Sequence, residues 1–289
     1  MALVIPTLPI GTPSIPEIQP EEMETIRRLL LERTGFHLCI YKEKCLMRRI
    51  NIRIRATDSG NPKDYCDLLE KDEREIGRLL KTLTIHVSHF FRNPSVFALL
   101  RDTVFPELFS SRGGNAGELL LWSVGCSTGE EPYALAIILR EYFASEMKRV
   151  PVRIIGTDIN AGIIELAREG LYPPERVSEL PTHLVERYFK EENGKLHISE
   201  KVREMVTFQR EDIFSREFTR KCDMILCRNV MIYFERPWQE EMLTGFAESL
   251  PEGGFLILGK SETVVGEARR HFNLFSPVER IYRATKAGL

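Results

Sequence analysis

The sequence lacks the cysteine spacings that mark a disulfide framework or a structural zinc site. Its six cysteines are scattered over 289 residues, none stands in a C-x-x-C pair, and the six histidines form no ligand-spaced cluster with them. This pattern is typical of reduced thiols in a cytoplasmic protein. We therefore expect a cytoplasmic protein without a metal site.

The chain also lacks a long uninterrupted apolar run. Residues 1–20, MALVIPTLPIGTPSIPEIQP, are apolar but contain five prolines and no basic segment, which excludes the continuous helix of a signal peptide or membrane span. No other stretch reaches the roughly 18 apolar residues that a spanning helix needs. We interpret residues 1–20 as a flexible proline-rich tail and expect no direct membrane insertion.

Neither sign of charge dominates. The formal net charge is −2, which argues against a general nucleic-acid binder and leaves electrostatic steering to local patches. With 43% hydrophobic residues the chain can bury a sizeable core. We expect a globular monomer that does not bind nucleic acid.

A helical pattern extends over residues 21–84. The run EEMETIRRLLLERTG places apolar residues at helical spacing, and Gly35 stands where a helix would end. A second helix is predicted at 42–55, and two shorter ones at 62–71 and 73–84. The sequence therefore predicts an N-terminal domain of four helices.

The predicted helix at 42–55 has one basic side. Its cations are Lys42, Lys44, Arg48, Arg49, Arg53 and Arg55, against the single acidic residue Glu43. A charged helix side is usually only solvated, but nearly uniform charge favours an anionic partner. An acidic protein helix bundle, RNA or acidic lipid would each fit this side.

Strand and helix patterns alternate farther along the chain. Strands are predicted at 119–124, 152–158, 205–212, 223–229 and 254–260, with helices at 131–145, 160–169 and 237–250. Several of these strands are nearly continuous apolar runs, as in parallel sheets covered on both faces. The pattern predicts a doubly wound α/β sheet, reached through a connecting stretch after the helical domain.

Two segments depart from this alternation. Residues 272–284 contain two β-type runs around Ser276-Pro277 and predict an antiparallel hairpin at the sheet edge. Residues 171–204 predict an inserted β-subdomain, with a hairpin turn at Asn193-Gly194.

The most informative motif is GCSTGEEPY at 125–133. It follows a predicted strand, but has neither the G-x-G-x-x-G of dinucleotide sites nor the Gly-Lys-Ser/Thr of triphosphate loops. Glu130 and Glu131 precede Pro132, a residue suited to the first helical turn. Two desolvated carboxylates would repel a phosphate there by several kcal/mol. The motif favours a ligand without phosphate that carries an ammonium or sulfonium.

S-adenosylmethionine meets this requirement. Asp158 ends the second predicted strand, where its carboxylate can accept hydrogen bonds from a ribose diol. We assign Glu131 to the cationic methionine end of the cofactor. Glu130 is expected only to complement the helix dipole, so that Glu131→Gln would lose cofactor affinity whereas Glu130→Gln would hardly change it.

Five runs resemble one known family. WSVGCSTGEEPYALA, IIGTDIN, FQREDIF, CDMILCRNVMIYF and, upstream, LTIHVSHFFRNP are similar to the CheR-type chemotaxis receptor methyltransferases, in order from about residue 21 to 283. The resemblance implies a Rossmann-like α/β methyltransferase domain at 85–289 with a β-subdomain at 171–204, after an all-helical domain at 21–84. It implies methyl transfer from S-adenosylmethionine to glutamate carboxylates on the cytoplasmic helices of methyl-accepting chemotaxis receptors, leaving S-adenosylhomocysteine.

The resemblance also implies the site residues. The cofactor contacts would be His86, Ser88, Arg92, Glu131, Asp158, Asp212, Ile213, Arg228 and Asn229. The family typically has asparagine where His86 stands and threonine where Ser88 stands. Serine keeps the hydroxyl, whereas histidine is larger and titrates near neutrality, so that cofactor affinity can depend on pH.

The chemistry requires alignment more than proton transfer. A glutamate carboxylate is already ionised at neutral pH and needs no general base. Exclusion of water and a near-attack geometry would supply most of the acceleration. We predict that Arg92 positions the carboxylate through a forked hydrogen bond, and that Tyr233 orients it near the methyl group.

The receptor would dock on the basic helix, through Lys44, Arg48, Arg49, Arg53 and Arg55. The loop at 191–195 is shorter than in family members that hold a receptor's C-terminal tether peptide. We therefore expect no dependence on such a tether.

Two alternatives remain open. A methyltransferase of this fold could act on RNA or on another protein side chain. A non-catalytic S-adenosylmethionine-binding regulatory module is a second possibility, which the presence of both Arg92 and Tyr233 disfavours.

Overall fold

The computed structural model describes residues 16–84, 88–112, 117–214 and 220–286. They form two compact units. The first takes the residues up to 84 together with the short segment Tyr233–Glu235, and the second takes the rest.

The first unit is helical. It contains α1 (Pro20–Thr34), the short 3₁₀ helix η1 (Leu38–Ile40), α2 (Glu43–Ala56), α3 (Pro62–Lys71) and α4 (Glu73–Leu83), which confirms the four predicted helices. Helix α1 ends at Gly35, which has a left-handed φ of 72°, as its position in the sequence indicates. The prediction of a tail to residue 20 is wrong at its end, because Ile18 is buried and α1 begins at Pro20. Residues 1–15 lie outside the described part.

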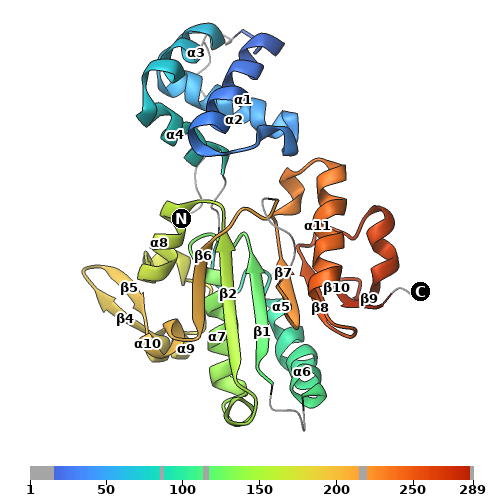
Figure 1. The fold of residues 1–289 in the computed structure, drawn as a ribbon. Helices are drawn as coiled ribbons and strands as arrows, with labels where there is room; N and C mark the ends of the chain where they lie inside the picture. The colour runs from blue at the N-terminus through green and yellow to red at the C-terminus, as the bar shows by residue number, and fades with distance from the viewer. Residues whose placement is uncertain (1–15, 85–87, 113–116, 215–219, 287–289) are drawn as a thin grey trace. The chain divides into compact units, whose positions relative to one another are not determined.

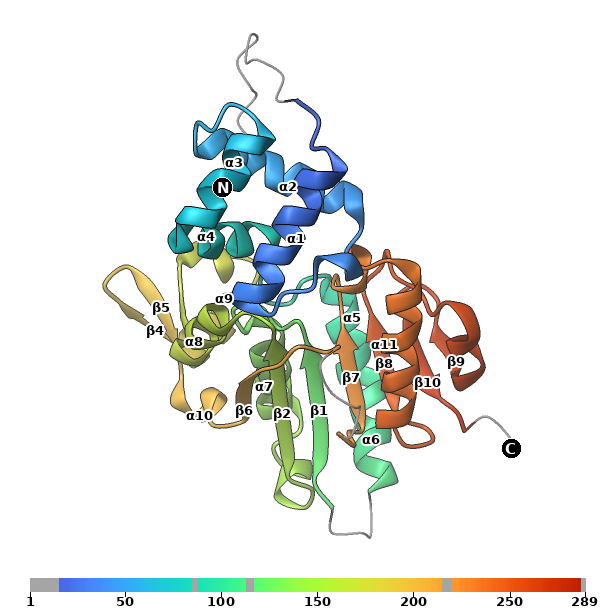
Figure 2. The same ribbon diagram turned by 45° about the horizontal axis from the view of Figure 1, so that its top comes forward.

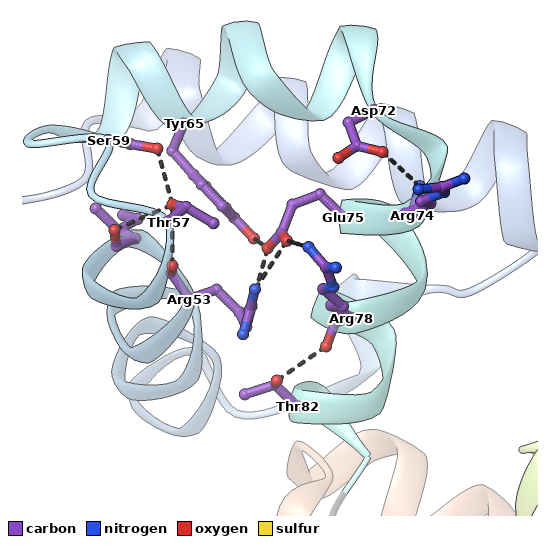
Figure 3. A network of polar contacts seen from close by, with 10 residues as sticks. Arg53, Thr57, Ser59, Tyr65, Asp72, Arg74, Glu75, Arg78 and Thr82 are labelled. Atoms are coloured by element: carbon purple, nitrogen blue, oxygen red, sulfur yellow. Dashed lines mark hydrogen bonds and ion pairs between the residues drawn. The ribbon is translucent and has the colours of Figure 1, made fainter.

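A buried carboxylate joins three helices of this unit (Figure 3). The side chain of Glu75 in α4 is 1% exposed. Arg53 of α2 donates two hydrogen bonds of 2.8 Å to it, and the Tyr65 hydroxyl of α3 donates one of 3.1 Å. A buried charge requires such partners. Burial is also the main cause of the raised pKa of Tyr65.

This network changes the interpretation of the basic side of α2. Arg53 is held by Glu75, and Arg49 donates a 2.5 Å hydrogen bond to the Thr82 carbonyl. Lys44, Arg48 and Arg55 are exposed. Two of the five predicted docking cations thus have contacts within the unit, and three face solvent.

The segment Tyr233–Glu235 completes the first unit. The Tyr41 ring lies 5.0 Å from the rings of both Phe36 and Phe234. The Lys42 amide donates to the Tyr233 carbonyl at 2.8 Å, and the Glu235 amide donates to Ile40 at 2.9 Å. Residues far apart in sequence therefore share one aromatic cluster.

The second unit contains a seven-stranded sheet in the order β6-β2-β1-β7-β8-β10-β9 (Figure 1). Its strands are β1 (Leu119–Val124), β2 (Val152–Asp158), β6 (Val206–Arg210), β7 (Met224–Cys227), β8 (Phe255–Leu258), β9 (Phe272–Ser276) and β10 (Ile281–Ala284). The first five are parallel, and β10 pairs antiparallel with both β8 and β9. The predicted sheet and edge hairpin are confirmed.

Helices cover both faces of this sheet. Predicted helices are present as α7 (Glu130–Tyr142), α8 (Ala161–Glu169) and α11 (Arg236–Ser249). Leu119 and Leu121 of β1 share a buried cluster with α7, whereas Trp122 of the same strand contacts Phe246 of α11, with 5.9 Å between ring centroids. In Figure 1, α7 lies behind β2 and α11 lies in front.

The stretch interpreted as a connection before β1 is largely helical. It contains α5 (Pro94–Leu99), a π-helical turn η2 (Leu100–Val104) and α6 (Phe105–Ser111). These helices join the buried cluster of α7. The sequence did not predict them.

The inserted segment forms a separate three-stranded sheet. Its elements are β3 (Leu171–Tyr172), η4 (Pro174–Arg176), α9 (Thr182–Tyr188), β4 (Phe189–Glu192), β5 (Lys195–Ile198) and α10 (Glu200–Arg203). Asn193 and Gly194 both have positive φ and form the predicted hairpin turn. Figure 2 shows this small sheet beyond the β6 edge of the large one.

The remaining short helices are η3 (Glu146–Lys148), η5 (Met231–Tyr233) and η6 (Gly266–His271). All six cysteines lie in described segments and are free thiols. Within the described ranges, no helix is both long and apolar enough to cross a membrane.

Candidate functional site

The glycine loop between β1 and α7 lies at the carboxyl edge of the sheet. Gly125 has φ +63°, and a Cβ built there would lie 2.6 Å from Cγ2 of Val230 in the loop after β7. Glycine is required at this position because both the backbone conformation and the close approach exclude a side chain. The loops after β1 and β7 therefore pack directly against each other.

A substitution at Gly125 should consequently be more harmful than one at a glycine with a similar backbone. We expect Gly125→Ala to lower the free energy of unfolding by about 3 kcal/mol, since strain in the left-handed region adds to overpacking. Gly194→Ala is the matched control, because Gly194 has φ +73° but no atom within 4 Å of its built Cβ. It should cost only ~1 kcal/mol. Equal losses in urea denaturation would contradict the close packing of the two loops.

Asp158 ends β2 beside this loop. Its Oδ2 accepts a hydrogen bond from the Ser127 amide at 3.1 Å, and its Oδ1 accepts one from the Asn160 amide at 3.0 Å. Ser127 has φ 52°, a conformation uncommon for a residue other than glycine. The aspartate thus fixes the turn of the glycine loop.

Glu131 forms an ion pair with Arg228. The Nη1 atom of Arg228 lies 3.0 Å from Oε2 of Glu131, and Ser123 donates to Oε1 at 2.8 Å. The side chain of Glu131 is 14% exposed, and that of Arg228 is 2% exposed. The structure thereby connects the start of α7 to the loop after β7.

Arg228 also reaches the segment that carries Arg92. Its Nη2 donates to the Arg92 carbonyl at 2.5 Å and to Oδ1 of Asn93 at 3.0 Å. Phe91 and Asn93, on either side of Arg92, have positive φ values of 54° and 61°. Strained non-glycine residues of this kind concentrate at functional sites. The backbone carbonyl of Arg92 and the side chains of Glu131 and Arg228 are therefore joined in one network.

Glu130 does more than complement the helix dipole. It is fully buried, accepts hydrogen bonds of 2.8 Å from the Thr128 hydroxyl, and lies 3.3 Å from Nη1 of Arg176. The Ser88 hydroxyl is a further partner, and burial raises the pKa of the glutamate. Because Glu130 joins three segments, Glu130→Gln should lower the stability of the protein. The small effect of this substitution on cofactor affinity stays a prediction.

The other predicted contacts occupy different places. Asp212 follows β6, beside the end of β2, and its Oδ1 accepts a hydrogen bond from the Phe214 amide at 3.0 Å. Ile213 is next to it and is half-buried. Asn229 adjoins Arg228 in the loop after β7, whereas Tyr233 belongs to the first unit. His86 lies outside the described residues.

The residues present fit S-adenosylmethionine. Eight buried polar side-chain atoms of the described residues have no hydrogen-bond partner, and three of them lie at this site: Ser127 Oγ, Arg228 Nε and Asn229 Oδ1. Buried polar groups are rarely left without partners, so such atoms indicate a ligand or ordered water. The cofactor's hydroxyl, ammonium and carboxylate groups can supply these partners. None of the described segments contains a cluster of three or more metal-ligating side chains.

Sequence patterns missed two residues of this region. Arg176, in the insert, pairs with Glu130 and donates to the Ser88 carbonyl. Glu262, after β8, accepts hydrogen bonds from backbone amides of the loop after β7. An isolated arginine in a turn and a glutamate after a strand carry no signal that names such partners.

Comparison with known proteins agrees with the geometry. Residues 21–84 match the model of the CheR methyltransferase all-alpha domain, and residues 86–280 match that of the CheR methyltransferase SAM binding domain. The cofactor is therefore S-adenosylmethionine, and the chain is a methyltransferase that depends on it.

Curated relatives align over most of their length. A chemotaxis protein methyltransferase of Borreliella burgdorferi is 30% identical, over 86% of this chain and 90% of the relative. Chemotaxis protein methyltransferase 2 of Pseudomonas aeruginosa is 33% identical, over 85% and 87%. A probable chemotaxis protein methyltransferase of Rhizobium etli is 31% identical, over 88% and 96%. This chain belongs to the CheR methyltransferase family.

Proposed function

We propose that this protein methylates glutamate side chains on the cytoplasmic helices of methyl-accepting chemotaxis receptors, forming γ-methyl esters for adaptation in chemotaxis. The observation that carries the proposal is the pair of family matches, one for each unit, in a chain whose relatives are named chemotaxis protein methyltransferases. The protein would act in the cytoplasm as a monomer.

The site suits a carboxylate acceptor. When bound, S-adenosylmethionine supplies an electrophilic methyl group. The ionised acceptor needs no general base, so the residues must hold and orient it. Arg228 holds the segment that carries Arg92, because it donates hydrogen bonds to the Arg92 backbone carbonyl and to the Asn93 side chain. We assign Arg92 the positioning of the carboxylate and Tyr233 its orientation near the methyl group.

Receptor docking is assigned to the exposed cations of α2. Lys44, Arg48 and Arg55 face solvent, and an acidic receptor helix bundle would complement them. The hairpin between β4 and β5 has the two-residue turn Asn193-Gly194. So short a loop supports methylation that does not depend on a receptor tether peptide.

The ester is tested through its chemistry. Purified protein would be incubated with methyl-labelled S-adenosylmethionine and receptor cytoplasmic fragments. We expect label on the receptor that mild alkali releases as methanol, since N-methyl and ribose O-methyl groups survive that treatment. Receptor fragments with the acceptor glutamates changed to alanine serve as the control. Alkali-stable label, or label on RNA alone, would contradict the proposal.

A further inference from the structure

The loop after β8 contains a carboxylate that is buried among backbone amides. Glu262 is 4% exposed. Its Oε1 accepts hydrogen bonds from the amides of Val230 (2.9 Å) and Ile232 (3.3 Å). Its Oε2 accepts them from the amides of Gly259 (2.6 Å) and Asn229 (2.8 Å). An ionised carboxylate has about four acceptor sites, so these four amides fill them.

Backbone amides take the place of a cation here. In the part of the chain that the structure describes, the donors to the Glu262 carboxylate are backbone amides. Burial raises the pKa of this carboxyl group, and its hydrogen bonds to the amides act in the opposite direction. Hydrogen bonds to an ionised acceptor are roughly twice as strong as neutral ones. The charge therefore holds the loop after β7 more firmly than a neutral side chain could.

The loop that Glu262 holds carries residues of the candidate site. Arg228 extends from it to Glu131, and Asn229 has φ 61°, a conformation that needs support. Val230 packs against Gly125 of the glycine loop. A shift of this loop would therefore move Arg228 together with Val230, the residue that packs against the glycine loop.

Gly259 shows how little room this arrangement leaves. A Cβ at Gly259 would lie 2.5 Å from Oε2 of Glu262 and 2.9 Å from the Asn229 amide nitrogen. Both distances are shorter than a carbon atom allows. The ends of β7 and β8, which are adjacent parallel strands, thus enclose the carboxylate tightly.

We propose that Glu262 is a positioning residue for methyl transfer, which fixes the loop 228–232 so that Arg228 and Asn229 face the cofactor. It touches neither cofactor nor receptor and acts through the loop. The effect of Glu262 on turnover assumes the proposed function. Its effect on cofactor binding assumes only that S-adenosylmethionine binds at the candidate site.

The test replaces Glu262 by glutamine in the full chain. The glutamine NH₂ group would face backbone N–H donors, so the loop must shift. We expect the Kd for S-adenosylhomocysteine, measured by calorimetry, to rise about tenfold, equivalent to ~1.4 kcal/mol. With receptor fragments, kcat should fall about 100-fold, because misplacement by an ångström has effects of this size. KM for the receptor should change little, since the basic side of α2 is unaltered.

Asp223→Asn is the matched control. Asp223 is also a buried carboxylate, 6% exposed, but it lies at the opposite edge of the sheet, where it accepts hydrogen bonds from Arg112 and from the Leu120 amide. Both variants should unfold at lower temperature, but only Glu262→Gln should lose cofactor affinity. If Asp223→Asn weakens cofactor binding equally, or if Glu262→Gln binds within twofold of the unaltered protein, the positioning role is refuted.

Glu262→Asp provides a second measurement if the glutamine variant does not fold. The aspartate keeps the charge on a shorter side chain, and we expect the Kd to rise about threefold. A Kd that equals that of the unaltered protein within the error of the measurement would overturn the proposal. If the unaltered protein binds the cofactor but does not esterify receptor glutamates, the proposed function is refuted. The comparison of Kd values between the variants remains valid in that case.

Discussion

Glu131→Gln should lower the free energy of unfolding by about 3 kcal/mol, the usual consequence of removing one partner from a buried ion pair. Arg228, whose side chain is only 2% exposed, would lose its carboxylate and keep only neutral acceptors. The same substitution removes the negative charge assigned to the cofactor's methionine end. We therefore also expect the Kd for S-adenosylmethionine to rise at least tenfold in calorimetry.

Glu118→Gln is the control for this variant. Glu118 also pairs with an arginine, Arg153, at 3.0 Å, but the two side chains are 41% and 53% exposed. An exposed pair contributes little, so both stability and cofactor affinity should be nearly unchanged. If Glu131→Gln were as mild as this control, the pair with Arg228 would have neither the structural nor the binding role assigned to it.

Arg53→Ala should destabilise the helical unit by about 3 kcal/mol, because it leaves the carboxylate of Glu75 buried without its forked partner. Hydrogen exchange should localise the loss of protection to α2, α3 and α4, the helices joined by this network. Binding to receptor fragments should weaken only in proportion to the fraction of protein in which the helical unit is unfolded.

Arg48→Ala separates docking from folding. Arg48 is on the same helix but exposed, so we expect the free energy of unfolding of the variant to change by no more than about 0.5 kcal/mol. Its affinity for the receptor should instead fall, most clearly at low salt where surface charges are least screened. Normal receptor binding by Arg48→Ala and by the corresponding Lys44 and Arg55 variants would refute docking on this side of α2.

The sequence predicted strands best where one apolar run fills a strand. The runs 119–124 and 152–158 coincide with β1 and β2, because parallel strands buried on both faces leave little ambiguity. The helices at 94–111 were missed, since they are short and interrupted by a π-helical turn. Arg48 and Arg53 looked equivalent, because a helical wheel does not show that α4 places Glu75 beside only one of them.

The site was predictable only where a motif carries the information. GCSTGEEPY and the acidic end of β2 pointed to the cofactor, and the structure joins them through the bond from Ser127 to Asp158. The partner Arg228 of Glu131 is 97 positions away, and the loop amides that bind Glu262 are 30 to 33 positions away. Arg228 itself reaches the Arg92 carbonyl across 136 positions. Such partners depend on the sheet order, which no local pattern contains.

The aromatic contact between Tyr41 and Phe234 has a consequence for synthesis on the ribosome. Helices α1 to α4 emerge early, but the segment Tyr233–Glu235 is translated much later. At the usual 5–20 residues per second, the nascent helical unit waits on the order of ten seconds or more for these residues. During that interval Phe36 and Tyr41 lack the ring of Phe234, the third member of the cluster. The helical unit, most of which is translated first, therefore cannot complete its packing until most of the chain has been translated.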